Sequence, residues 1–195
     1  MPGLTKEQLD AKVAGRTVAK DFLDCARSHG SLVALREMVG EDDWREYTFD
    51  DVAAKVATTA GGLRSLGVGP GDRVVLMMRN IPAFHWVDLA VLFLGATPVS
   101  IYNSSSSDQV EYLVSHCGAK VAVLENSDFV DRFAPVRAKL DRLESIVVLD
   151  PAAAGGDVLG PDVLEGEALD LEAEAQTGSP DDLATIIYTS GTTGS

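Results

Sequence analysis

The sequence lacks the features that mark membrane, secreted and zinc-binding proteins. No window approaches the roughly 18 uninterrupted apolar residues of a membrane span, and the N-terminus MPGLTKEQLDAKVAGR has no signal-peptide core. The only two cysteines, Cys25 and Cys117, lie far apart and have no cysteine or histidine at a metal-ligand spacing. We therefore expect a cytoplasmic protein with no transmembrane segment, no metal site of its own, and two reduced, buried thiols.

Positive charge is missing from the last part of the chain. The net charge is −14, and no lysine or arginine follows Arg142, whereas Glu144 and further acidic residues do. Nucleic-acid backbones are bound by clustered cations, so we expect no nucleic-acid partner. The acidic stretch is interpreted as a solvated connector.

The remaining composition is that of a soluble globular chain, with 195 residues of which 46% are apolar and 24% charged. This is enough for one domain or slightly more. Thr48 and Asp51 form a capping-box variant, and apolar residues then recur at helical spacing up to Gly67. Further helices are predicted at 82–94, 108–116 and 129–140. Short apolar runs predict strands at 74–78, 98–101, 121–124, 146–149 and 185–189.

Strands that alternate with helices of this length predict an α/β fold with a mainly parallel sheet. Right-handed crossovers place helices on both faces of such a sheet. Residues 150–180 are rich in alanine, glycine and acids, and we expect a surface excursion there with a short edge strand.

Several residues that suggest chemistry are assigned structural roles. The three histidines have no acidic or nucleophilic partner at motif spacing, so we expect surface or packing roles for His29, His85 and His116. Phe84 and Trp86 are expected in the core. The serine run Ser104–Ser107 is expected to cap a helix, with Ser106 and Gln109 as one candidate pair, rather than to bind an anion.

The last eleven residues, TIIYTSGTTGS, place a glycine- and hydroxyl-rich turn directly after an apolar strand. Successive backbone N–H groups of such a turn can converge on a phosphate, although the GxxxxGK[ST] pattern is absent. Composition alone leaves an ordinary flexible turn as the alternative.

The motif YTSGTTG resembles the signature loop of the AMP-forming adenylating enzymes, which include acyl-CoA synthetases, firefly luciferase and peptide-synthetase adenylation domains. The resemblance continues upstream, in order, through the stretches REYTFDDVAAKVATTAGGLRSLGVGPGDRVVLMMRN, AFHWVDLAVLFLGATPVSIYNSSSSDQVEYLVSHCGAKVAVLEN and DDLATIIYTSGTTG. Within the superfamily the chain looks most like bacterial long-chain fatty acyl-CoA synthetases. The implied fold is part of the large N-terminal domain of such an enzyme.

The resemblance implies a ligase that joins a fatty acid to ATP, releases pyrophosphate, and transfers the acyl group to coenzyme A, with Mg²⁺ as the metal. It assigns the ATP phosphates to Thr189, Ser190, Gly191, Thr192, Thr193 and Gly194. The family's loop continues as Pro-Lys-Gly, so residues 1–195 are expected to be the N-terminal portion of an AMP-binding domain, cut within the phosphate loop. No catalytic residue and no metal ligand is assigned.

Three functions remain open. In the first, the chain is a piece of a long-chain fatty acid–CoA ligase, and peripheral membrane attachment of the full enzyme is left open. In the second, it belongs to an acyl-AMP ligase or an amino-acid adenylation domain. In the third, it is a short non-catalytic binding module. We expect the isolated chain to be inactive and to self-associate through the surface around Thr185–Thr189.

Overall fold

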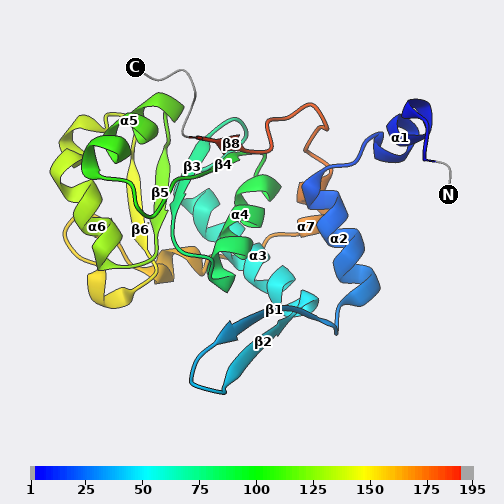
Figure 1. Ribbon diagram of the computed structural model, residues 1–195, viewed down its shortest axis with the longest axis horizontal. Coiled ribbons are helices and arrows are strands. Elements are labelled where there is room, and N and C mark those ends of the chain that lie inside the picture. Colours follow the sequence, from blue (N-terminus) through cyan, green and yellow to red (C-terminus); the bar gives the residue numbers. More distant parts are fainter. Residues whose placement is uncertain (1–2, 190–195) are drawn as a thin grey trace.

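A computed structural model describes residues 3–189, and its strands and helices alternate from Thr48 onwards as predicted (Figure 1). The helices are α1 (Lys6–Val13), α2 (Val18–His29), α3 (Phe49–Ser65), α4 (Pro82–Phe93), α5 (Ser107–Cys117), α6 (Ser127–Phe133) and α7 (Leu171–Ala175). The strands are β1 (Val33–Met38), β2 (Trp44–Thr48), β3 (Arg73–Met77), β4 (Thr97–Ser100), β5 (Val121–Leu124), β6 (Ser145–Val148), β7 (Val158–Leu159) and β8 (Ile186–Ile187). Short 3₁₀ helices are η1 (Ala134–Lys139), η2 (Pro151–Ala153) and η3 (Pro161–Leu164).

The main sheet has six strands in the order β7-β6-β5-β3-β4-β8, and all its pairs are parallel. The chain moves one way across this sheet from β3 to β4 and from β7 to β8, and the other way from β4 through β5 and β6 to β7. Because crossovers are right-handed, the two directions place their helices on opposite faces. The crossover helices α4 and α7 therefore lie on one face and α5 and α6 on the other (Figure 1). Helices α2 and α3, which precede the main sheet, pack on the same face as α4. The predicted α/β fold is confirmed.

The strands are buried on both faces, which explains why they read as continuous apolar runs. In β3, Val74 and Leu76 belong to the core that α3 and α4 cover, whereas Val75 and Met77 belong to the core beneath α5. All four side chains are 0% exposed. Alternate residues of one strand thus hold two hydrophobic layers together.

The predicted caps are present. The Thr48 hydroxyl accepts from the Asp51 N–H at 3.1 Å, and an Asp51 carboxylate oxygen accepts from the Thr48 N–H at 2.8 Å. Ser106 and Gln109 make the same reciprocal pair at the start of α5, which confirms a capping role for that serine turn. Gly118 ends α5 with a φ of 64°, a left-handed conformation that favours glycine.

The helix predicted at 129–140 is wrong in its second half. Helix α6 ends at Phe133, and the chain continues as the 3₁₀ helix η1. Pro135 is the physical reason, because it has no N–H for an α-helical hydrogen bond and its ring crowds the preceding turn. Proline fits the first turn of a new helical segment, where it lies here.

The acidic stretch is not the solvated connector that its charge suggests. It does supply the predicted edge strand, β7, but Leu164, Leu171 and Ala175 are buried in the core beside α3 and α4. Its glutamates also face cations of α2 and α3, in the ion pairs Arg27–Glu172, Lys55–Glu165 and Arg64–Glu174. Residues 161–176 are therefore a packed strap across α3.

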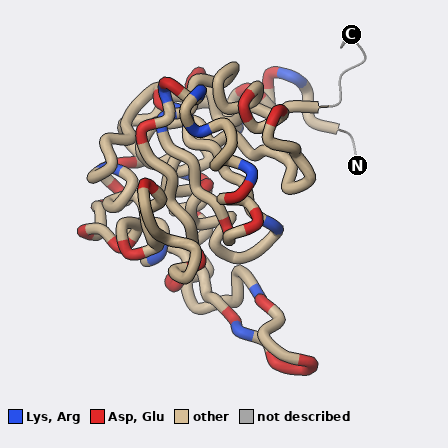
Figure 2. Tube along the Cα trace, turned by 90° about the vertical axis from the view of Figure 1, so that its left-hand side faces the viewer, with Lys and Arg blue, Asp and Glu red and all other residues tan. Residues whose placement is uncertain are grey.

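The N-terminal part adds a hairpin that the sequence did not predict. Strands β1 and β2 pair antiparallel and project from the body, with an acidic tip (Figures 1 and 2). Trp44 and Met38 face each other across this hairpin and are 54% and 63% exposed.

The two cysteines are both free. Cys117 is buried as expected, but Cys25 is only half-buried. None of the helices within residues 3–189 has the length and apolar character needed to cross a membrane.

Candidate functional site

The carboxyl ends of the parallel strands meet at one edge of the sheet, which is where open α/β sheets bind ligands. Arg79 follows β3, Asn103 follows β4, Glu125 follows β5 and Thr189 follows β8. The topology therefore brings segments that are far apart in sequence to the same edge.

Of the residues predicted to hold ATP phosphates, the structure describes only Thr189. Thr189 is exposed and lies two residues beyond the end of β8. Ser190, Gly191, Thr192, Thr193 and Gly194 lie outside the described residues. The predicted return of the chain to the sheet is confirmed, because β8 pairs with β4.

Strand β8 is short and is held partly by side chains. The Thr97 hydroxyl donates to the Leu183 carbonyl at 3.0 Å, and the Thr185 hydroxyl donates to the Pro98 carbonyl at 3.4 Å. Both bonds lie just before the paired positions Val99–Ile186 and Ser100–Ile187, so they align the chain as it enters the strand that leads to Thr189.

An ion pair joins the ends of the two central strands. The Arg79 backbone N–H donates to Glu125 Oε2 at 2.7 Å, and Arg79 Nε donates to Oε1 at 2.7 Å. The Glu125 side chain is 9% exposed and that of Arg79 64%. Burial raises the pKa of Glu125, but the hydrogen bonds and charge of Arg79 outweigh it, so the pKa of Glu125 lies below its usual value. The carboxylate is therefore ionised and fixes the loop after β3.

The loop after β4 is tied to α6. The Arg132 guanidinium donates to the Ser105 carbonyl at 3.0 Å and also to the Asn103 carbonyl, and it lies 5.5 Å from the centroid of the Phe129 ring. This arginine is thus engaged in holding a loop rather than free to bind an anion.

Tyr188 lies between β8 and Thr189 and reaches helix α5. Its hydroxyl is 2.8 Å from His116 Nδ1, and the His116 ring stacks on Tyr112. Burial, followed by the nearby Cys117 and Tyr112, raises the pKa of Tyr188. His116 was expected to have a surface or packing role. No sequence signal predicts its contact with Tyr188, because the two are 72 residues apart.

The other residues that the sequence singled out do not gather at this edge. Phe84 and Trp86 are partly buried and pack against the core, as expected. Among residues 3–189, no three or more histidine, cysteine or acidic residues come together as a metal site. A cavity of about 310 Å³ lies beside the start of β4, between Val13, Leu92 and Leu183, and Thr189 does not line it.

Comparison with known proteins shows which family the chain resembles. A family model described as "AMP-binding enzyme" matches residues 22–195. The chain is 38% identical over 138 residues to "Uncharacterized protein Rv1549" of Mycobacterium tuberculosis, with 70% of this chain and 74% of that protein covered. It is 34% identical over 154 residues to "Long-chain-fatty-acid--CoA ligase FadD15" of Mycobacterium bovis, with 77% of this chain but only 25% of the ligase covered.

Among solved structures, the anthranilate CoA ligase AuaEII in complex with anthranoyl-AMP superposes with a TM-score of 0.77 at 24% identity. The match covers 92% of this chain and 32% of that protein, and at this identity it indicates a shared fold alone. The chain thus spans a quarter to a third of the length of the two ligases.

Proposed function

The chain belongs to the AMP-binding enzyme family, and we propose that it serves an ATP-dependent ligase that joins a long-chain fatty acid to coenzyme A. In this proposal the segment from Thr189 to Gly194 binds the β- and γ-phosphates of ATP. The single observation that carries it is the sequence YTSGTTG placed directly after β8, at the carboxyl edge of a parallel sheet. The fatty-acid substrate is supported by the 34% identity to the relative FadD15.

The chemistry of the segment fits a phosphate ligand. It offers four hydroxyl groups and two glycines, whose backbone N–H groups can turn toward an anion. Burial of ATP, with about four negative charges, also requires cations, which lysine and Mg²⁺ usually supply. No lysine or arginine follows Arg142, and residues 3–189 contain no cluster for a metal. We therefore assign Mg²⁺ and CoA to no residue of this chain.

The test compares the complete product of the gene, whatever its length, with the 195-residue chain. Both are assayed for palmitate-dependent pyrophosphate release and for consumption of CoA, and MgATP binding is measured by calorimetry. We expect turnover from a product that continues with Pro-Lys-Gly. We expect neither turnover nor micromolar MgATP affinity from the 195-residue chain, because no lysine or arginine follows Arg142 to offset the charge of the phosphates.

Different results would contradict the two parts of this proposal, which are the inactivity of the 195-residue chain and the choice of a fatty acid and CoA as substrates. Palmitate-dependent pyrophosphate release by the 195-residue chain would contradict the assignment of the chemistry to residues beyond it. A complete product that uses an amino acid or an aromatic acid, or forms an acyl-adenylate without consuming CoA, would replace the fatty acid–CoA ligase by one of its relatives.

A second candidate is a short, non-catalytic binding module with the same fold. It is favoured by one comparison: the match to Rv1549 covers 74% of that protein, so a relative of similar length exists. A stop codon directly after Ser195, together with absence of turnover, would support this candidate over the ligase.

A further inference from the structure

Tyr188 provides the last side-chain anchor that the structure describes before the phosphate-binding segment. Strand β8 pairs with β4 at only two positions, Val99 with Ile186 and Ser100 with Ile187. Ile187 is 73% exposed. So short a pairing at a sheet edge restrains Tyr188 and Thr189, the two described residues that follow it, only weakly. The direction in which the chain leaves β8 must therefore depend on further contacts.

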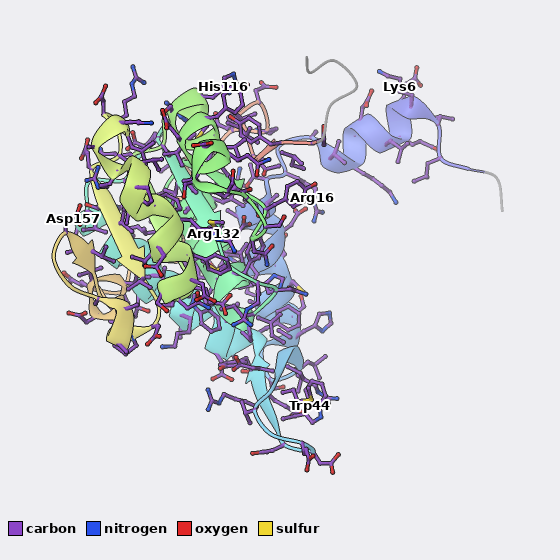
Figure 3. All side chains as sticks on the ribbon, turned by 60° about the vertical axis from the view of Figure 1, so that its left-hand side comes forward. Lys6, Arg16, Trp44, His116, Arg132 and Asp157 are labelled. Carbon is purple, nitrogen blue, oxygen red and sulfur yellow. The ribbon has the colours of Figure 1, made fainter. Side chains whose placement is uncertain are left out.

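Those contacts come from the last two turns of α5. Tyr188 packs against the core beneath α5, and its hydroxyl lies 2.8 Å from Nδ1 of His116. The two rings meet edge to face, with centroids 5.7 Å apart and an interplanar angle of 75°. Tyr112, one turn earlier on α5, stacks on the His116 ring, with centroids 5.4 Å apart and an interplanar angle of 26°. Figure 3 labels His116 at the end of α5.

The helix that carries His116 is itself fixed. Its start is closed by the Ser106–Gln109 capping box, its inner face buries Val110 and Val114, and Gly118 ends it. A hydrogen bond from Tyr188 to this helix thus connects the weakly paired end of β8 to a rigid element of the fold. The hydroxyl and Nδ1 form one bond in either tautomer of the imidazole, with the tyrosine as donor or as acceptor.

We propose that His116 is a positioning residue for phosphate binding: it holds the hydroxyl of Tyr188 and thereby sets the backbone of Thr189 in the orientation from which the segment meets the phosphates. His116 does not touch the ligand in this proposal. Its effect is preorganisation, because a segment whose first residue is already placed loses less conformational freedom when it binds. The inference rests on the function proposed above for Thr189–Gly194.

The test uses the 195-residue chain with pyrophosphate at millimolar concentration as the probe, and binding is followed by NMR. Tyr188→Phe removes the hydroxyl, and His116→Phe keeps a ring against Tyr112 but removes Nδ1. His116→Asn places an amide near the position of Nδ1 and should restore the bond. Tyr112→Phe is the matched control, because it keeps the stack and removes a hydroxyl that makes no side-chain hydrogen bond within the described residues.

We expect Tyr188→Phe and His116→Phe to weaken pyrophosphate binding by about three- to tenfold, the change that corresponds to one net hydrogen bond. His116→Asn and Tyr112→Phe should bind as the wild type does. All four should remain folded at the temperature of the binding experiment, which thermal unfolding checks. Equal affinity in Tyr188→Phe and the wild type would overturn the proposal, and so would a loss in Tyr112→Phe as large as that in Tyr188→Phe.

Two further readouts separate this inference from the proposed function. The ¹⁵N shifts of the His116 imidazole and the exchange rate of the Thr189 amide report the anchor without any ligand. If the wild type binds no pyrophosphate, the phosphate assignment for this chain fails. The hydrogen bond between Tyr188 and His116 is still supported as the contact that positions Thr189 if Tyr188→Phe changes either readout, and it is rejected if neither changes.

Discussion

Asp88 is a charged group that the fold accommodates poorly. It lies in the middle of α4, a helix with no exposed residue, and burial alone raises its pKa from 3.8 to about 6. The folded state therefore disfavours the ionised carboxylate. Sequence alone does not show this penalty, because a single aspartate in an apolar helix can equally face water.

Replacement of Asp88 by asparagine should stabilise the protein at neutral pH. The penalty is absent below 3.8, grows as the pH rises to about 6, and is complete above it. We expect Asp88→Asn to raise the free energy of unfolding by about 1–2 kcal/mol at pH 8, after allowance for partial exposure, and by less than half of that at pH 4.5. Urea unfolding at both pH values measures the difference. Asp131→Asn, at an exposed position of α6, is the control and should not stabilise the protein at pH 8.

Glu125 has the opposite behaviour, because Arg79 favours its charged form. Its pKa is lowered from 4.5, so its contribution to stability is present above that pH and is lost as the pH falls through the folded-state value. Glu125→Gln should lower the free energy of unfolding by about 1–3 kcal/mol at pH 7, since a hydrogen-bonded charge is removed from the Arg79 amide and guanidinium. The loss should shrink at pH 3.5. The exposed Glu144→Gln is the control, and an equal loss in both variants would contradict this account.

The packed strap, residues 161–176, and helix α3 form a close backbone interface. The Gly166 N–H donates to the Thr58 carbonyl at 3.1 Å and the Leu169 N–H to the Ala57 carbonyl at 3.2 Å. A Cβ on Gly61 would lie 1.9 Å from the Glu167 carbonyl oxygen. The glycine pair Gly61-Gly62 inside α3 is thus required by this approach of two backbones, although glycine weakens a helix.

This interface predicts that Gly61→Ala destabilises the protein, although alanine is the better helix former by about 1 kcal/mol. The clash is with backbone, which cannot rotate away, so we expect a net loss of about 1–3 kcal/mol in the free energy of unfolding. Gly69→Ala is the matched control, because nothing lies within 4 Å of a Cβ there. Urea unfolding gives the two free energies, and limited proteolysis should show earlier cleavage within residues 161–176 in Gly61→Ala. A stabilised Gly61→Ala would show that the strap is not held as closely as described.

Within residues 3–189, the main sheet ends on one side at β8, and no further described strand pairs with its outer edge. β8 is the last strand in the order on that side, and Ile187 and Leu183 near it are 73% and 59% exposed. Exposed strand edges pair with other chains, and contiguous apolar patches commonly mark contact surfaces. In contrast, the edge formed by β7 leads directly into η3 and the strap.

We therefore expect the isolated chain to self-associate through the β8 edge at tens of micromolar. Ile187→Lys should shift the population toward monomer, because a lysine on an edge strand opposes edge-to-edge pairing. Met38→Lys, at an equally exposed site on the hairpin, should leave the association unchanged. Sedimentation velocity or light scattering measures the mass. A strictly monomeric wild type, or dissociation by Met38→Lys instead of Ile187→Lys, would reject this interface.

The sequence by itself determined those features whose cause is local. Helix caps at Thr48 and Ser106 and the buried runs of β3 and β5 follow from contacts within a few residues or from apolar runs, and each is confirmed. The alternation of these elements was sufficient to predict a parallel sheet with two covered faces, because crossover handedness leaves few alternatives. The motif after β8 was sufficient to indicate the family.

Tertiary structure alone decided everything that depends on distant partners. The acidic stretch is a packed strap because Leu164, Leu171 and Ala175 enter the core beside α3 and α4. Arg27, Lys55 and Arg64 also pair with its glutamates, from helices 110 or more residues earlier. The hydrogen bonds of His116 with Tyr188 and of Arg79 with Glu125 form because the sheet order places their elements side by side. Charge and hydropathy along a chain describe what each residue prefers, but a pairing also needs a position in space, and that position is set by the packing of the whole sheet.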